Sequence, residues 1–150
     1  MSAGTPLAEG TELRGRPRVM TRERMRWYVD AQPTVARDSG RIERQEATIH
    51  DDDEYARSQG LPGIIADGMV STNWIMGLLI DTFGDGVARK GALRTKYVRP
   101  IYENDAIVCR GRVTGVARGA GGAVTYRLDV WCENAKGEAV TVGDATVILP

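Results

Sequence analysis

The stretch DGMVSTNWIMGLLIDTF, residues 67–83, decides the fold. Its apolar side chains cover nearly the whole circumference of a helix, and a helix that is apolar all round is a buried one. Asp67 suits the position that caps the first turn, and Gly84 suits the end of the last turn. The sequence therefore predicts one long buried helix that the rest of the chain must cover.

Two shorter helices are expected before this segment. Residues 21–32 carry apolar side chains at helical spacing behind Thr21, which can cap them. Residues 51–59 form the second predicted helix, with Asp51 as its cap. The polar residues 33–48 between them show no clear period, which predicts a loop.

After residue 84 the pattern of apolar residues changes from helical to alternating. The predicted strands, in chain order, are residues 16–20, 93–98, 106–116, 123–132 and 138–149. Turn-rich links between the later strands predict hairpins, and hence an antiparallel meander with one apolar face. This sheet must wrap around the central helix for the helix to lose its water. The expected class is therefore α+β, the hotdog fold, an antiparallel sheet wrapped around one long central apolar helix, which usually needs a second protomer.

Composition narrows the class of protein. The chain has 150 residues, with 20 basic and 20 acidic side chains. The length predicts one domain over residues 11–150, after a flexible tail at residues 1–10. The charge balance argues against a nucleic-acid partner and against a polybasic membrane binder. Because the first residues lack a signal sequence and no apolar run could span a bilayer, a cytoplasmic protein without a membrane partner is expected.

Neither the cysteines nor the acidic run predicts a metal site. Cys109 and Cys132 each lie in an apolar, strand-like run, which favours buried free thiols in a reducing compartment over a disulfide. Residues 51–53, three aspartates, lack the ligand order and the glycine of a calcium-binding loop. Acidic residues at a solvated helix N-terminus explain them better.

Three segments resemble a known family, the MaoC-like (R)-specific enoyl-CoA hydratases. Residues 45–56, QEATIHDDDEYA, are similar to the family's D-x-N-P-I-H-x-D-x-x-x-A, and residues 65–69, IADGM, are similar to its I-x-H-G-M. Residues 99–105, RPIYEND, resemble its R-P-V-x-x-G-D. The resemblance runs from about residue 12 to the end of the chain. It implies that water is added or removed at the α,β bond of an acyl-CoA or acyl-carrier thioester.

The resemblance also implies partners. CoA would enter as part of the substrate, no cofactor or metal is expected, and the chain should form a homodimer or a higher homo-oligomer. Members of the family hold CoA phosphates with basic residues near the dimer seam, which makes candidates of Arg94, Lys96 and Arg99. The alternative is that these three residues form the solvent face of a strand.

The sequence departs from the family at the residues that carry the chemistry. Gln45 occupies the position of the family's catalytic Asp, and Asp67 stands where the second motif has His. Gln45 can orient a water or an imidazole, but it cannot take a proton or carry a charge. Hydration therefore depends on which other groups supply the acid and the base.

Hydration of an enoyl thioester needs a base for the water, an acid for the α carbon and donors for the enolate oxygen. His50, the single histidine of the chain, is the expected proton handler. Asp67 is favoured as the partner that orients the imidazole, ahead of Gln45, Glu43 and Glu46.

The amino end of the predicted central helix is expected to supply the donors. The N–H groups of Gly68 and Met69 would lie at the positive end of the helix dipole and polarise the thioester carbonyl. Gly68 would also let the substrate approach the backbone closely. Asn73 stands where the family's central helix often carries a Ser, and it is expected either to line the site or to be satisfied within the core.

Two other functions stay open at this level. A catalytically degenerate subunit, which binds acyl thioesters or pairs with an active partner, is suggested by Gln45. A hotdog thioesterase is suggested by Asp67, because that chemistry needs a carboxylate near the thioester carbon.

Overall fold

The computed structural model describes residues 7–31 and 47–150. At its centre lies the predicted helix, α3 (Gly68–Phe83), which begins at Asp67 and ends at Gly84. The Asp67 carboxylate accepts a hydrogen bond of 2.8 Å from the Met69 N–H, so the predicted cap is confirmed. Gly84 has a φ of 82°, a left-handed conformation that glycine adopts without strain.

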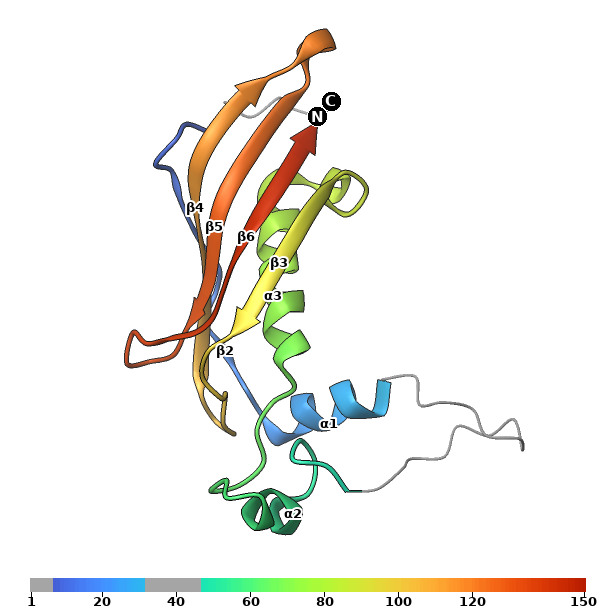
Figure 1. Ribbon diagram of the computed structural model, residues 1–150, viewed down its shortest axis with the longest axis vertical. Helices are drawn as coiled ribbons and strands as arrows, with labels where there is room; N and C mark the ends of the chain where they lie inside the picture. Colours follow the sequence, from blue (N-terminus) through green and yellow to red (C-terminus); the bar gives the residue numbers. More distant parts are fainter. Residues whose placement is uncertain (1–6, 32–46) are drawn as a thin grey trace, which may run out of the picture.

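A six-stranded antiparallel sheet accompanies this helix (Figure 1). Its strands are β1 (Glu12–Arg14), β2 (Arg18–Val19), β3 (Gly91–Tyr97), β4 (Ala106–Arg118), β5 (Val124–Glu133) and β6 (Ala139–Leu149). Their order is β1-β4-β5-β6-β3, with β2 paired to β4. The long strands β4, β5 and β6 run alongside α3, so the predicted sheet around one central helix is confirmed.

Two details of the predicted sheet were wrong. β3 does not pair with its neighbour in sequence, β4, but with β6, where residues 91–97 oppose residues 147–141. The residues after β3 cross past β6 and β5 to reach β4, and on the way Val98 N–H donates to Val140 O over 2.9 Å. The short strand β1 was missed, because it offers only Leu13 as a buried side chain, too little for an alternating pattern.

The core lies between the sheet and α3. Alternation along β5 is as predicted, since Tyr126, Leu128 and Val130 are buried while Arg127 and Asp129 are exposed. The buried residues of α3 are Val70, Ser71, Ile75, Leu78 and Leu79. α3 is thus buried along one side in a single chain, and the prediction of a helix buried all round is not met by one protomer.

Two short helices lie beyond the amino end of α3 (Figure 1). α1 (Arg22–Ala31) is capped by the Thr21 hydroxyl, as predicted, through a 3.2 Å bond from the Arg24 N–H. α2 (Asp53–Ser58) is capped by Asp52 and not by Asp51. The Asp51 carboxylate instead accepts the Thr48 N–H over 2.8 Å, because the chain is still turning there.

An ion-pair cluster ties this layer together. The Arg22 guanidinium contacts Asp53 over 2.8 Å and Glu103 over 2.6 Å, which joins α1 to α2 and to the link between β3 and β4. The Asp53 carboxylate also accepts the Ile64 N–H over 3.1 Å. The hydrogen bond from Arg22, and after it the one from Ile64, lowers the pKa of Asp53 below its ordinary value. The segment that leads into α3 is therefore fixed in position.

Candidate active site

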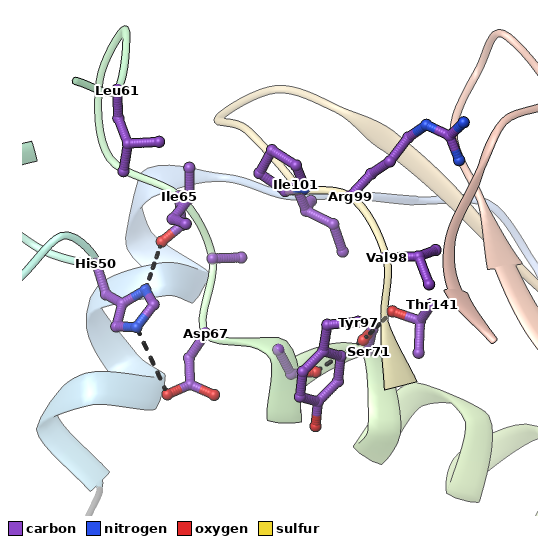
Figure 2. Close-up of a pocket in the computed structure, with 13 residues that line it drawn as sticks. His50, Leu61, Ile65, Asp67, Ser71, Tyr97, Val98, Arg99, Ile101 and Thr141 are labelled. Carbon is purple, nitrogen blue, oxygen red and sulfur yellow. Dashed lines mark hydrogen bonds and ion pairs between the residues drawn. The ribbon is translucent and has the colours of Figure 1, made fainter. Parts of the chain in front are cut away.

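A cavity of about 520 Å³ opens at the amino end of α3 (Figure 2). Its walls come from α2's C-terminal link, from the start of α3, from the end of β3 and from the link after it. The residues that line it are His50, Leu61, Ile65, Ala66, Asp67, Gly68, Ser71, Tyr97, Val98, Arg99, Pro100, Ile101 and Thr141. The structure thus brings four of the predicted site residues, His50, Asp67, Gly68 and Arg99, into one cavity.

The imidazole of His50 is held in one orientation. Its Nδ1 lies 2.9 Å from the carbonyl oxygen of Ile65. Because a carbonyl can only accept, Nδ1 must carry the proton, and in the neutral ring Nε2 is then the unprotonated acceptor. Figure 2 shows Nε2 directed toward Asp67. The group that fixes the tautomer is thus a backbone carbonyl, where a carboxylate was expected.

The two carboxylate oxygens of Asp67 have different neighbours. Oδ1 accepts the Met69 N–H, and Oδ2 lies 4.0 Å from Nε2 of His50. A separation of 4.0 Å is too long for a direct hydrogen bond, but it leaves room for a bridging water or substrate hydroxyl. His50 and Asp67 therefore lie side by side at this cavity, at a separation that a single water or hydroxyl bonded to both groups would span.

The helix start offers fewer donors than predicted. The Met69 N–H donates to the Asp67 carboxylate, so in this structure it is not available to polarise a substrate carbonyl. Among the residues that the structure describes, the Gly68 N–H has no hydrogen-bond partner. Gly68, which lines the cavity, therefore remains as the candidate donor at the helix end.

The aromatic ring of Tyr97 packs directly on Gly68. A Cβ atom at position 68 would lie 2.5 Å from Cδ2 of Tyr97, closer than carbon atoms can approach. The Tyr97 hydroxyl bonds the Thr72 hydroxyl over 2.9 Å and lies 3.2 Å from the Met69 sulfur. Sequence analysis assigned Tyr97 only to a strand, and no local pattern could reveal that its ring covers the amino end of α3.

A buried pair of hydroxyls forms the floor of the cavity. Ser71 Oγ lies 2.7 Å from Thr141 Oγ1 and donates to the Gly68 carbonyl, also over 2.7 Å. Because Ser71 has one proton, Thr141 must donate to Ser71. Sequence analysis missed both residues, although Ser71 follows Gly68 by three positions and therefore shares its helix face.

Asn73 lies away from this cavity. It is exposed, does not line the site and is not in the core, so neither expectation for it was met. Its side chain interacts with the hydroxyl of Tyr28 on α1. Burial, and after it the negative charge of Asp67, raises the pKa of Tyr28. The helix turns about 100° per residue, so two positions beyond Ser71 point to a different side.

The basic candidates differ in position. Arg94 is bound to Asp144 on the neighbouring strand over 2.7 Å, and neither Arg94 nor Lys96 lines the cavity. Arg99 does line it, and its guanidinium donates to the Ala139 carbonyl over 2.8 Å. The remaining candidates, Gln45, Glu43 and Glu46, lie outside the described residues.

Neither a metal cluster nor a membrane-spanning helix is found in residues 7–31 and 47–150. No group of three or more His, Cys, Asp or Glu side chains in this part of the chain is placed to hold an ion. None of its helices is both long and apolar enough to cross a bilayer.

Comparison with known proteins places this chain in a family. A model described as MaoC like domain matches residues 46–132. The MaoC-like dehydratase from Rhodospirillum rubrum is 20% identical, with a TM-score of 0.72 over 95% of this chain and 92% of that one. The (R)-hydratase from A. caviae is 18% identical, with a TM-score of 0.72 over 96% and 98%.

The complex HadBC, a 3R-hydroxyacyl-ACP dehydratase from Mycobacterium tuberculosis, is 18% identical, with a TM-score of 0.70 over 94% of this chain and 96% of that one. A search of curated proteins found no match. At such identities the solved structures establish the hotdog fold, while the family model covers more than half of the sequence. The chain therefore belongs to the family of MaoC-like domains.

Proposed function

We propose that this protein adds or removes water at the α,β bond of an acyl-CoA or acyl-carrier thioester. The observation that carries the proposal is the orientation of His50. Its Nδ1 proton is held by the Ile65 carbonyl, which leaves Nε2 as a base in a residue that lines the same cavity as Gly68. Proton transfer and carbonyl polarisation, the two needs of this chemistry, thus meet in one place.

In the hydration direction, the attacking water lies between Nε2 of His50 and Oδ2 of Asp67. Nε2 takes a proton as the water oxygen bonds to the β carbon, and the electrons of the double bond move to the thioester oxygen. The Gly68 N–H, with the positive end of α3 behind it, stabilises that oxygen. The imidazolium then returns a proton to the α carbon, and dehydration is the reverse sequence.

The walls of the cavity suit an acyl chain. Apolar side chains that include Leu61, Ile65 and Ile101 surround the space on one side, and Arg99 supplies a positive charge. A cavity of about 520 Å³ has the size of an ordinary small-molecule site. Arg99 is the basic residue best placed for a CoA or carrier phosphate, with Lys96 and Arg94 farther out. The proposed reaction uses no metal and no redox cofactor.

A second copy of the chain is the proposed partner. In the described structure β3 is an edge strand that pairs only with β6, and Tyr97 and Val98 at its end are 46% and 41% exposed. An open edge beside a half-covered apolar helix is a surface that soluble proteins usually cover. HadBC and ChsH1-ChsH2, both similar in structure, are complexes of two kinds of chain. Here a homodimer is proposed, in the cytoplasm, and light scattering after size exclusion tests the subunit number.

Turnover of crotonyl-CoA and longer enoyl-CoAs tests the function directly. Loss of the enoyl absorbance by the parent protein, and not by His50→Gln, is the expected result. Asp67→Asn keeps an oxygen for the cap and removes the charge, so it separates the structural role of Asp67 from its chemical one. No hydration above background from the folded parent protein would overturn the proposal.

The same reactions should be read with a thiol reagent. Release of free CoA would identify a thioesterase and favour a nucleophilic or base role for Asp67. If neither product forms and the protein makes a stable complex with a second MaoC-like chain, the result favours the degenerate subunit.

A further inference from the structure

Cys109 and Cys132 face each other across β4 and β5 and take no part in the proposed reaction. They are partners in the strand register, and as predicted both are buried free thiols. Their sulfur atoms lie 3.1 Å apart. Directly opposed residues of antiparallel strands have Cα atoms about 4.5–5.5 Å apart, within the range of about 4.4–6.8 Å that a disulfide spans. The backbone is thus already suited to a cross-link.

We propose that Cys109 and Cys132 form a redox modification site, at which a hydroperoxide converts the two thiols into a cross-strand disulfide. The sulfur atoms need to approach by only about 1 Å to reach the bonded distance of about 2.0 Å. The chain contains only these two cysteines, so within one chain the product is unique.

The two sulfurs differ in access. Cys109 is 5% exposed and lines a second cavity of about 680 Å³, between residues 15–18 and α3. Cys132 is fully buried, with its sulfur 3.8 Å from the Ser71 carbonyl. A small oxidant therefore reaches Cys109 first, and the more deeply buried Cys132 is the resolving thiol.

The pKa shifts of the two thiols also favour Cys109 as the attacking thiol and Cys132 as the resolving one. The hydrogen bond with Cys132, and after it the charge of Arg18, lowers the pKa of the Cys109 thiol, which favours the reactive thiolate. That hydrogen bond, together with burial, raises the pKa of Cys132. The Arg18 guanidinium is held over the ring of Trp74 at 5.5 Å, at the wall of the same cavity.

The reaction balances in two steps. The Cys109 thiolate attacks the terminal oxygen of the hydroperoxide, the O–O bond breaks, and the leaving alkoxide takes a proton, which gives a sulfenic acid and an alcohol. Cys132 then attacks the sulfenic sulfur, an S–S bond forms, and the oxygen leaves as water with the thiol proton of Cys132. Two thiols are oxidised by two electrons, and the peroxide is reduced.

Hydrogen peroxide added to the purified full-length protein provides the test. We expect the intact mass to fall by the mass of two hydrogens, the free-thiol count under denaturing conditions to fall to zero, and a non-reducing peptide map to join the segments of Cys109 and Cys132. Dithiothreitol should restore both thiols. Two free thiols after treatment, or a disulfide between chains, would overturn the proposal.

Variants test the order of attack. Dimedone, which traps sulfenic acids, should label Cys132→Ser after peroxide and should leave Cys109→Ser unlabelled. Arg18→Gln should slow disulfide formation several-fold, while Arg112→Gln, at an exposed position on the same strand as Cys109, should not. Equal labelling of both serine variants would contradict the assignment of Cys109 as the attacking thiol.

Discussion

The two halves of α3 have different surroundings. In the second half, Ile75, Leu78 and Leu79 are buried against the sheet, where apolar contact is the main interaction. In the first turn, Gly68 and Ser71 border a partly open cavity that contains charged and hydroxyl groups. Under the proposed function, the second half of α3 holds the fold together and the first turn carries the chemistry. Substitutions in the two regions should therefore affect different measurements.

The largest effect is expected at His50. Gln at position 50 can still donate to the Ile65 carbonyl but cannot exchange protons, so His50→Gln should lower enoyl-CoA hydration about 10²–10⁴-fold. The midpoint of thermal unfolding should stay close to that of the parent protein. Steady-state kinetics and a thermal melt on the same sample provide both values. Full activity would show that the imidazole is not the proton handler.

A core substitution should give the opposite pattern. Leu128 on β5 is almost fully buried, so Leu128→Ala should lower the free energy of unfolding by about 2–5 kcal/mol. Val116→Ala, at an exposed position of β4, is the matched control and should change it by less than about 0.5 kcal/mol. Urea titration measures both, while turnover per folded molecule should persist. Loss of turnover in folded Leu128→Ala would contradict the proposed separation between residues that stabilise the fold and residues that carry the chemistry.

Gly68 lies in the first turn but also packs on Tyr97 of the sheet, so its substitution should have an intermediate effect. The added methyl of Gly68→Ala would collide with the Tyr97 ring, and such overpacking typically costs about 1–3 kcal/mol. In a Tyr97→Ala background the same change should cost much less, because the ring is gone. A double-mutant cycle by urea titration measures this coupling. Additive effects would mean that Tyr97 does not pack on Gly68.

The smallest effect concerns acid stability. The folded-state pKa of Asp53 lies below its ordinary value of 3.8, so its contribution to stability is complete above that value and is lost as the pH falls through the folded-state pKa. Asp53→Asn should therefore flatten the decline of stability with acid. Glu54→Gln, at the exposed neighbouring position, should leave the decline unchanged. Urea titrations at a series of acidic pH values measure the free energy of unfolding of each variant and so compare the declines.

The two regions also differ in how far the sequence predicts them. α3, its Asp67 cap and the alternation along β5 follow from local periodicity, which a single segment contains in full. The pairing of β3 with β6 joins segments that lie far apart in the chain, and no local pattern encodes it.

The candidate site depends even more than the sheet on contacts between residues that lie far apart in the sequence. Tyr97 meets Gly68 and Thr141 meets Ser71 only because the sheet brings β3 and β6 onto the start of α3. A helix that is apolar on nearly every side offered no cue to choose Ser71 over Asn73 as the residue that faces the cavity. Asp52 caps α2 because the Asp51 carboxylate is bound to Thr48 in the preceding turn. The sequence could not distinguish these two adjacent aspartates, since either one suits a cap.

The orientation of the one imidazole tests the central claim most directly. Because His50 is the single histidine, a long-range ¹H–¹⁵N spectrum of histidine-labelled protein contains one side chain and needs no assignment. We predict the tautomer with the proton on Nδ1, and a shift of its Nε2 signal when a saturated acyl-CoA is added. A ring that averages between tautomers and does not respond to the acyl-CoA would contradict the account.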